Sequence, residues 1–147
     1  MKNSIREYYE NGNVKAEYQI NESGKLHGTA KIYHENGNVK AEQQFNKKGE
    51  RHGINKLYHK NGQLQVEVNW TNGIQDDGEI IFYHDNGVKA RQVKRLKGSF
   101  NGDFSEWYKN GQKKIQGTYK NDKPNIHKEW DQDGKPMSEE MLNKINK

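Results

Sequence analysis

The sequence contains no cysteine, only two prolines and no long apolar run. Without cysteine the chain forms no disulfide and offers no thiolate, which fits a reducing compartment without requiring one. No stretch approaches the length that crosses a bilayer, and residues 1–6 lack the apolar stretch of a signal peptide. We therefore expect a soluble, cytoplasmic protein. The alternative is an exported protein whose signal peptide has been removed.

Apolar residues are also scarce: 29% of the 147 residues are hydrophobic and 31% are charged. The length suits one ordinary domain, but this composition argues against a thick two-layer core. Low hydrophobicity usually favours disorder. However, three Trp and eight Tyr recur at regular offsets, which indicates specific packing. A single-layer sheet, in which each repeat packs on its neighbours, agrees with both observations.

What the sequence does contain is a period. Asn-Gly recurs at steps of 25, 25, 25 and 24 residues, and Asp133-Gly134 follows 23 residues later. A fixed period of this size indicates a repeat architecture. Asn-Gly between alternating segments predicts a β-hairpin with a type I′ turn, in which both central residues have positive φ. The predicted turns are 11–12, 36–37, 61–62, 86–87, 110–111 and 133–134, with structural glycines Gly12, Gly37, Gly62, Gly87, Gly111 and Gly134.

The arm after each turn alternates apolar and polar residues, as in Val39, Ala41 and Phe45 with Lys40 and Glu42 between them. This alternation predicts half-buried strands. In the fourth copy one residue is missing after the turn, so Val88 and Ala90 are predicted to take the apolar places. We predict an all-β fold: an elongated, single-layer antiparallel meander of about six hairpins over residues 1–136.

The arm before each turn carries an aromatic residue three positions ahead of the Asn or Asp. We predict that these aromatics stack along the repeat axis as a structural spine. The six residues are Tyr8, Tyr33, Tyr58, Tyr83, Trp107 and Trp130.

The tail, residues 137–147, reads as a short capping helix. Ser138 is a suitable N-cap, and Glu139 and Glu140 follow in the first turn. Met141, Leu142 and Ile145 are expected to cover the last strand, because the open edge of a terminal repeat needs protection.

The unit Gly-x4-Tyr-x-x-Asn-Gly followed by Val-Lys-Ala-Glu, in residues 28–42 and again with Leu-Gln-Val-Glu in residues 53–67, resembles the bacterial variant of the MORN repeat. The similarity extends over residues 6–135 and is greatest to the YwqK-type proteins labelled toxin–antitoxin antitoxins. The resemblance implies a repeat scaffold, and it implies a toxin as the partner. Other MORN units have a Gly-x-Gly step that is reduced here to a single Gly.

No set of side chains in the sequence indicates catalysis. His34, His59 and His84 occupy equivalent places, but two strands separate them, so successive imidazoles lie about 10 Å apart and cannot share a metal ion. Glu17, Glu42 and Glu67 read as a solvated face with cross-strand ion pairs. No nucleophile elbow, P-loop or dinucleotide fingerprint is present. We predict no catalytic residue, no metal site and no cofactor.

Positive charge is concentrated in residues 86–128, which carry 11 Lys or Arg against 3 Asp or Glu. Such a patch attracts an acidic protein, an anionic phospholipid surface or nucleic acid. Nucleic acid is disfavoured because no recognised binding motif accompanies the charge. The alternative is that these charges only keep the protein soluble and bind no partner. The predicted partner-binding residues are Lys89, Arg91, Lys94, Arg95, Lys97, Lys109, Lys113 and Lys114.

The sequence thus favours a non-catalytic repeat scaffold that binds another protein through its sheet, with a toxin as the partner that the resemblance implies. A peripheral module for anionic membranes is the alternative. Carbohydrate binding by exposed aromatics requires that the protein be exported. Neither the oligomeric state nor the binding face follows from the sequence.

Overall fold

The computed structural model describes residues 3–147, and in this part of the chain there are thirteen strands and one short helix. The chain divides into two compact units, Met1–Asp76 and Asp77–Lys147. In each unit the long strands follow one another as an open antiparallel meander. The all-β class, the hairpin repeat and the short C-terminal helix are therefore confirmed.

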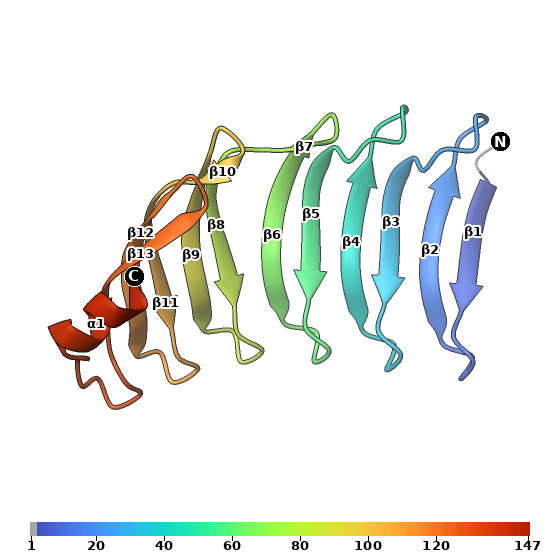
Figure 1. Ribbon diagram of the computed structural model, residues 1–147. Coiled ribbons are helices and arrows are strands. Elements are labelled where there is room, and N and C mark those ends of the chain that lie inside the picture. The colour runs from blue at the N-terminus through green and yellow to red at the C-terminus, as the bar shows by residue number, and fades with distance from the viewer. Residues whose placement is uncertain (1–2) are drawn as a thin grey trace. The chain divides into compact units, whose positions relative to one another are not determined.

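Unit 1 is a meander in the order β1-β2-β3-β4-β5-β6, with the short β7 paired to β6 (Figure 1). Its strands lie side by side in one layer. Their bounds are β1 Asn3–Tyr8, β2 Val14–Ile20, β3 Gly28–Tyr33, β4 Val39–Phe45, β5 Gly53–Tyr58, β6 Leu64–Thr71 and β7 Ile74–Gln75.

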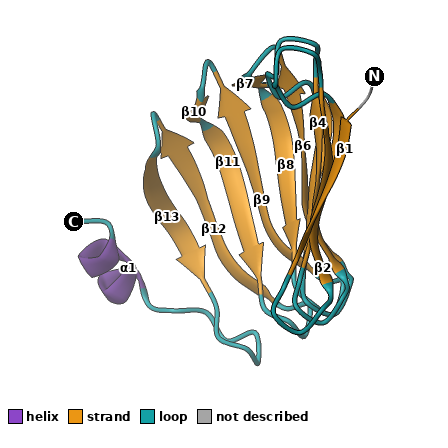
Figure 2. Ribbon diagram, turned by 90° about the vertical axis from the view of Figure 1, so that its right-hand side faces the viewer, coloured by secondary structure: helices purple, strands orange, loops and turns teal. Residues whose placement is uncertain are grey.

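Unit 2 continues the pattern in the order β8-β9-β11-β12-β13, with the short β10 paired to β9. The helix α1 follows the last hairpin and lies beside β13 (Figure 2). The bounds are β8 Gly78–Tyr83, β9 Lys89–Leu96, β10 Ser99–Phe100, β11 Gly102–Trp107, β12 Lys113–Lys120, β13 Lys123–Glu129 and α1 Glu139–Ile145.

The Asn-Gly turns differ from the predicted type I′ turn. In the first, Gly12 N–H donates to Tyr9 O at 3.0 Å, and Tyr9 N–H donates to Asn13 O at 2.8 Å. This is a three-residue loop, and only its glycine has positive φ, +86°. The type I′ prediction was therefore wrong here. Turns with two positive φ values occur instead between hairpins, for example at Asn72 (+47°) and Gly73 (+83°).

One face of each sheet holds the buried side chains. In unit 1 these are Ala30, Ala41, Asn55 and Val66, and in unit 2 they are Ile80, Val93 and Phe104. In two pairs the cross-strand partners compensate for size, because Ala30 faces Gln43 and Phe104 faces Gly117. The buried Ile80 instead faces the buried Val93, so two branched aliphatic side chains pack together there.

The fourth hairpin corrects a second expectation. His84 N–H donates to Val88 O at 2.8 Å, so Val88 closes the turn as Asn38 does in the second hairpin. Lys89 then pairs with Tyr83, and Arg91 pairs with Phe82. Val88 and Ala90 therefore do not take the apolar strand places as predicted. The turn has its full length, and basic residues occupy two places that are apolar in other hairpins.

The helix α1 begins as predicted, because the Ser138 hydroxyl accepts a hydrogen bond from Met141 N–H. Leu142 is buried, but Met141 and Ile145 remain 53% and 48% exposed, so only one of the three apolar residues covers the sheet. A different contact closes the edge of β13. The Asn146 side chain accepts from Ile126 N–H and donates to Ile126 O, as a neighbouring strand would.

Candidate partner-binding site

The turn ends of successive hairpins are joined by side-chain hydrogen bonds to main-chain carbonyls. Asn36 Nδ2 and Asn38 Nδ2 both donate to Lys60 O at 2.8 Å. Asn86 Nδ2 donates to Lys109 O at 2.8 Å. In each case the donor lies one repeat before the acceptor, so these junction bonds run in one direction along the chain. We use the name junction bonds for this set throughout.

The histidine row belongs to the same junctions. His34 Nε2 lies 3.0 Å from Tyr58 O, and His84 Nε2 lies 2.7 Å from Trp107 O. A carbonyl only accepts, so each imidazole carries its proton on Nε2. Tyr9 and Tyr108 occupy the same place in their hairpins and donate through their hydroxyls. The sequence shows a His or Tyr side chain, which can donate a hydrogen bond, at this position in successive repeats. The acceptor is a main-chain carbonyl, which no residue type identifies, so the bond could not be predicted from the sequence.

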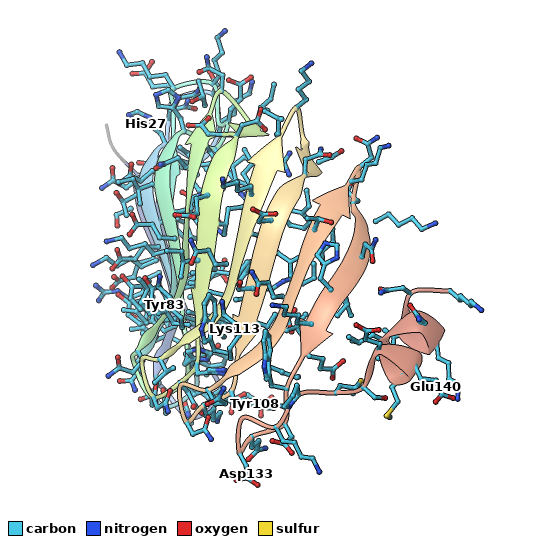
Figure 3. All side chains as sticks on the ribbon, turned by 90° about the vertical axis from the view of Figure 1, so that its left-hand side faces the viewer. His27, Tyr83, Tyr108, Lys113, Asp133 and Glu140 are labelled. Atoms are coloured by element: carbon cyan, nitrogen blue, oxygen red, sulfur yellow. The ribbon has the colours of Figure 1, made fainter. Side chains whose placement is uncertain are left out.

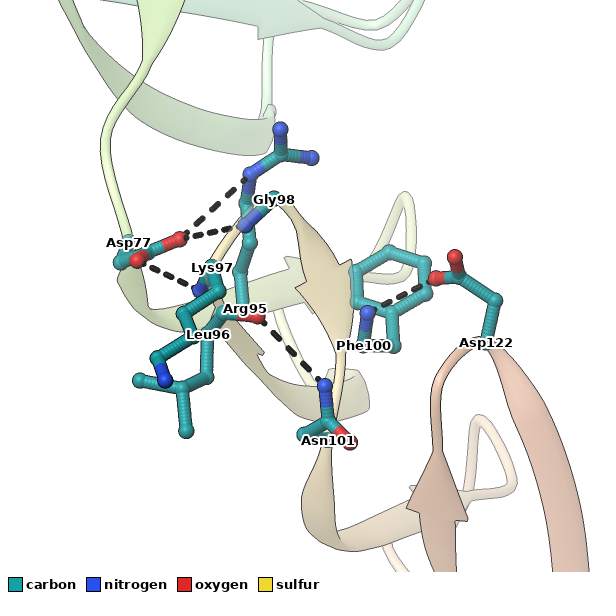
Figure 4. A network of polar contacts seen from close by, with 8 residues as sticks. All are labelled: Asp77, Arg95, Leu96, Lys97, Gly98, Phe100, Asn101 and Asp122. Carbon is teal, nitrogen blue, oxygen red and sulfur yellow. Dashed lines mark hydrogen bonds and ion pairs between the residues drawn. The ribbon is translucent and has the colours of Figure 1, made fainter.

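The turns between hairpins are joined in a similar way (Figure 4). In unit 2, Asp77 Oδ2 accepts from Lys97 N–H at 2.7 Å and Oδ1 accepts from Gly98 N–H at 3.1 Å. These N–H donors, Gly98 first and then Lys97, hold the pKa of the Asp77 carboxyl below its usual range. Asp122 Oδ1 accepts from Phe100 N–H at 2.7 Å. Both carboxylates therefore have a structural role, because they accept hydrogen bonds from N–H groups of neighbouring turns.

The predicted carboxylate face has cross-strand ion pairs. Glu17 binds Arg6 at 2.6 Å, Glu42 lies 3.9 Å from Lys31, and Glu67 lies 3.5 Å from Lys56. Each pair joins directly opposed residues of one hairpin. The prediction of a solvated, ion-paired face is confirmed.

None of the six aromatics predicted as a spine is among the buried side chains of the sheet. Tyr8 is 58% exposed, and the other five are half-buried. The Tyr33 hydroxyl donates to Glu17 Oε2 at 2.9 Å. Burial, and to a smaller degree this hydrogen bond, raise the pKa of Tyr33. Close ring contacts join Phe100 and Phe104 to Tyr119. The sequence did not predict which side chains are buried, because the buried set includes two alanines and an asparagine.

The structure distributes the predicted basic patch over different surfaces. Arg91 and Arg95 share the buried face with Val93, and each lies near a carboxylate, Glu106 at 3.4 Å and Asp77 at 3.9 Å. Three other members lie elsewhere: Lys97 in a turn, Lys109 paired with Asp85 at 2.8 Å, and Lys114 with its Nζ 5.5 Å from the Tyr108 ring centre.

The remaining three lysines are Lys89, Lys94 and Lys113, of which Lys113 lies toward the turn end of unit 2 (Figure 3). Lys89 Nζ and Lys113 Nζ lie 5.9 Å and 5.7 Å from the centre of the indole ring. Lys94 and Lys113 line a hollow beside Trp107, and the rest of its lining, which includes two carboxylates, is Glu79, Gln92, Asp103, Phe104 and Ser105. Within residues 3–147 none of these lysines has an ion-pair partner. We call this set the Trp107 groove.

The floor of the Trp107 groove is held by polar contacts. Gln92 accepts from Lys89 Nζ at 3.4 Å and donates to Glu79, the residue that begins the groove on β8. The indole N–H of Trp107 makes no hydrogen bond within the described residues. The groove therefore combines lysine ammonium groups, one indole donor and an aromatic surface, which can bind an anionic side chain, with the carboxylates of Glu79 and Asp103.

Among residues 3–147 there is no group of three or more His, Cys, Asp or Glu side chains that could hold a metal ion. The part of the chain that the structure describes also has no helix long and apolar enough to cross a membrane.

Comparison with protein families gives one match. The MORN repeat variant family matches residues 4–22, 26–47, 51–72 and 100–121, more than half of the chain. The fourth hairpin lies outside these ranges, and it is the one in which Lys89 and Arg91 replace apolar residues. No curated protein matches the chain. These four matched segments show that the chain belongs to the MORN repeat variant family.

Proposed function

We propose that this protein is a non-catalytic MORN-variant scaffold whose Trp107 groove binds an acidic segment of another protein. The observation that carries the proposal is the pair of unpaired ammonium groups on Trp107. In several hairpins a lysine or arginine lies opposite a carboxylate, as Lys31 lies opposite Glu42. Here Lys89 and Lys113 face solvent and an aromatic ring instead.

The geometry favours an acidic peptide over a membrane surface. A flat anionic bilayer is best met by cations that share one exposed face. In this protein Arg91 and Arg95 point to the opposite face from Lys94, because alternate residues of β9 face opposite ways. Lys94 and Lys113 instead line a hollow beside Trp107, whose aromatic ring provides an anchor for an extended segment.

The identity of the partner belongs to this proposal too. The resemblance to antitoxins leads us to propose a toxin protein with an acidic surface, which this chain would neutralise by covering that surface. The lysines would raise the association rate, and Trp107 would slow dissociation. The binding would weaken with added salt because the ammonium groups are exposed.

The test is titration of a fluorescent peptide of consecutive glutamates at low salt. Lys113→Glu is expected to weaken binding by about tenfold, about 1.4 kcal/mol, because it reverses charge beside Trp107. Lys120→Glu makes the same change in net charge at an exposed position on the same strand and is expected to change affinity little. Equal losses in both variants would contradict a local site.

Binding to lipid vesicles tests the alternative function, attachment to an anionic membrane. Phosphatidylserine vesicles and phosphatidylcholine vesicles are compared with the wild type and with Lys113→Glu. The proposal expects weak binding to both compositions. Strong, salt-sensitive binding to the anionic vesicles alone, with no glutamate-peptide binding, would replace the peptide partner with a lipid surface.

A further inference from the structure

Asparagine followed by glycine is chemically labile, because no side chain on the glycine shields its main-chain nitrogen from the asparagine amide. The sequence has seven such pairs, which begin at residues 11, 36, 61, 72, 86, 101 and 110. Five of them are the hairpin turns described above. The other two, Asn72-Gly73 and Asn101-Gly102, lie in the connections between hairpins. None of these asparagines belongs to the Trp107 groove.

In the hairpin turns both ends of the side-chain amide are held. Asn36 Oδ1 accepts from Asn38 N–H at 3.0 Å, and Asn36 Nδ2 donates to Lys60 O at 2.8 Å. Rotation of this amide toward the glycine nitrogen would break both contacts. The same two kinds of contact are made by Asn11, Asn86 and Asn110.

The two connection asparagines differ from each other. Asn101 Oδ1 accepts from Asn121 N–H at 2.9 Å, and Asn101 Nδ2 donates to Leu96 O at 3.4 Å, so this amide also has a contact at each end. Asn72 Oδ1 accepts only from Asn46 Nδ2, at 3.3 Å. Asn72 Nδ2 donates to no atom within residues 3–147. The Asn72 amide is therefore less restrained than those of the hairpin turns.

The turn that contains Asn72 is also weakly paired. Asn72 and Gly73 are the two loop residues between β6 and β7, with φ of +47° and +83°. Strand β7 is only two residues long, and residues 71–74 are exposed. Local opening of so short a pairing has a low free-energy cost. Opening releases the Gly73 N–H, which in the closed turn donates to Arg51 O at 2.8 Å.

We propose that Asn72 is a site of spontaneous deamidation, at which water converts the residue to aspartate or isoaspartate with release of ammonia, and that the isoaspartate form separates β7 from β6. The turn asparagines with junction bonds are protected from the same reaction. The proposal is independent of partner binding.

The reaction needs only this chain and water. The Gly73 nitrogen, after it loses its proton to hydroxide, attacks Asn72 Cγ. A C–N bond forms, the Cγ–Nδ2 bond breaks, and Nδ2 leaves with a proton from water as ammonia. Water then opens the resulting succinimide ring. Attack at Cγ gives aspartate, whereas attack at the main-chain carbonyl carbon gives isoaspartate.

The isoaspartate form does not fit the present turn. Its main chain passes through Cγ, which adds one carbon atom between residues 72 and 73. The length of a two-residue loop fixes the register of the strands that it joins, so the added atom disrupts the pairing of β7. The new carboxylate also lies near that of Glu50, because Asn46 Nδ2 donates to Glu50 Oε2 at 2.9 Å as well as to Asn72 Oδ1.

The test is incubation of the folded wild type at mildly alkaline pH, followed by peptide mapping in a mass spectrometer. Each rate of amide loss is divided by the rate for the same residue in urea, which removes the effect of neighbouring residues in the sequence. This ratio is expected to be about fivefold larger for Asn72 than for Asn36, because one further hydrogen bond of typical strength protects the Asn36 amide.

Asn72→Lys is the matched control for the structural effect. Lys97 occupies the equivalent place in the turn between β9 and β10 and has φ of +51°, so lysine is compatible with this turn and has no amide to lose. In incubated wild type, hydrogen exchange at the amides of β7 should become faster in proportion to the isoaspartate content, which fragmentation in the mass spectrometer distinguishes from aspartate. The same incubation should leave Asn72→Lys unchanged.

Three results would overturn the proposal. An Asn72 ratio no larger than that of Asn36 would contradict a preferred site of deamidation. Full protection of the β7 amides in chains that carry isoaspartate at position 72 would contradict its effect on the turn. Faster exchange of β7 in incubated Asn72→Lys as well would show that the incubation opens this turn without any deamidation.

Discussion

At the scale of single residues, the turn asparagines use both ends of their amide. Asn36 Oδ1 accepts from Asn38 N–H at 3.0 Å, which shapes its own turn, while Asn36 Nδ2 donates to the next hairpin. Gly37 follows with φ of +91°, a conformation that other residues adopt at a cost. The Asn-Gly pair is therefore selected for two reasons, and only the glycine is needed for positive φ.

A substitution can separate the two roles of Asn36. Asn36→Asp keeps an oxygen for Asn38 N–H, removes one of the two side-chain donors to Lys60 O, and places a carboxylate beside that carbonyl. We expect the free energy of unfolding to fall by about 1 kcal/mol, measured by urea denaturation. Asp133→Asn makes the reverse exchange in the last turn, where no junction bond forms, and is expected to have little effect. A stability loss for Asn36→Asp no larger than the effect of that control would argue against the junction bond.

At the scale of secondary structure elements, the strands followed from the sequence but their registers did not. Alternation in residues such as Val39 and Ala41 reflects a sheet with one buried face, so β4 could be predicted. The fourth hairpin could not, because Val88 and Ala90 continue the alternation while the closing turn bond fixes a different register. Turn geometry outweighs side-chain pattern there, since a shift by one residue would break the paired main chain.

The sequence predicted that lysines contribute to the candidate site, but it did not predict where in the fold these lysines lie. The excess of lysine in residues 86–128 is visible in sequence, and Lys89 and Lys113 belong to the predicted set. Their meeting at Trp107 depends on the β9–β11 and β11–β12 pairings, which link residues well apart in the chain. Arg91 looked like part of the same patch, but its register on β9 turns it toward Glu106.

The contact between turns gives a pH prediction. Because the N–H groups of Gly98 and Lys97 lower the folded-state pKa of Asp77, the carboxylate stabilises the fold at pH above the ordinary value of about 4. This contribution is lost as pH falls through the lower, folded-state pKa. We expect Asp77→Asn to show a smaller drop in unfolding free energy than wild type when pH is lowered from about 6 to about 2.5. Denaturation in urea at several pH values measures this.

The control for Asp77→Asn is Asp103→Asn. The Asp103 carboxylate accepts no hydrogen bond within residues 3–147, so this substitution removes a carboxylate without breaking a contact to a turn. If both variants retain the full acid dependence, the contact of Asp77 with the turn does not contribute to it.

At the scale of the whole molecule, each hairpin is held mainly by its neighbours. Junction bonds join a hairpin to the next one along the chain, and the strand pairs within each unit are sequential. Stability in such an array is a sum of local terms and nearest-neighbour terms. A defect in one hairpin should therefore weaken that hairpin and those beside it before it affects distant ones.

Gly117 provides such a defect. A Cβ at this position would lie 2.3 Å from Asn125 O and 2.7 Å from Phe104 Cε1, so Gly117→Ala forces β11 and β13 apart around β12. Overpacking of this kind costs about 1–3 kcal/mol. Hydrogen exchange followed by mass spectrometry should show lost protection in β11, β12 and β13, with strands of unit 1 close to wild type. Gln116→Ala, at an exposed neighbouring position, should change neither unit. Equal loss of protection in both units for Gly117→Ala would mean that the chain unfolds as one cooperative body, and stability could then no longer be assigned hairpin by hairpin.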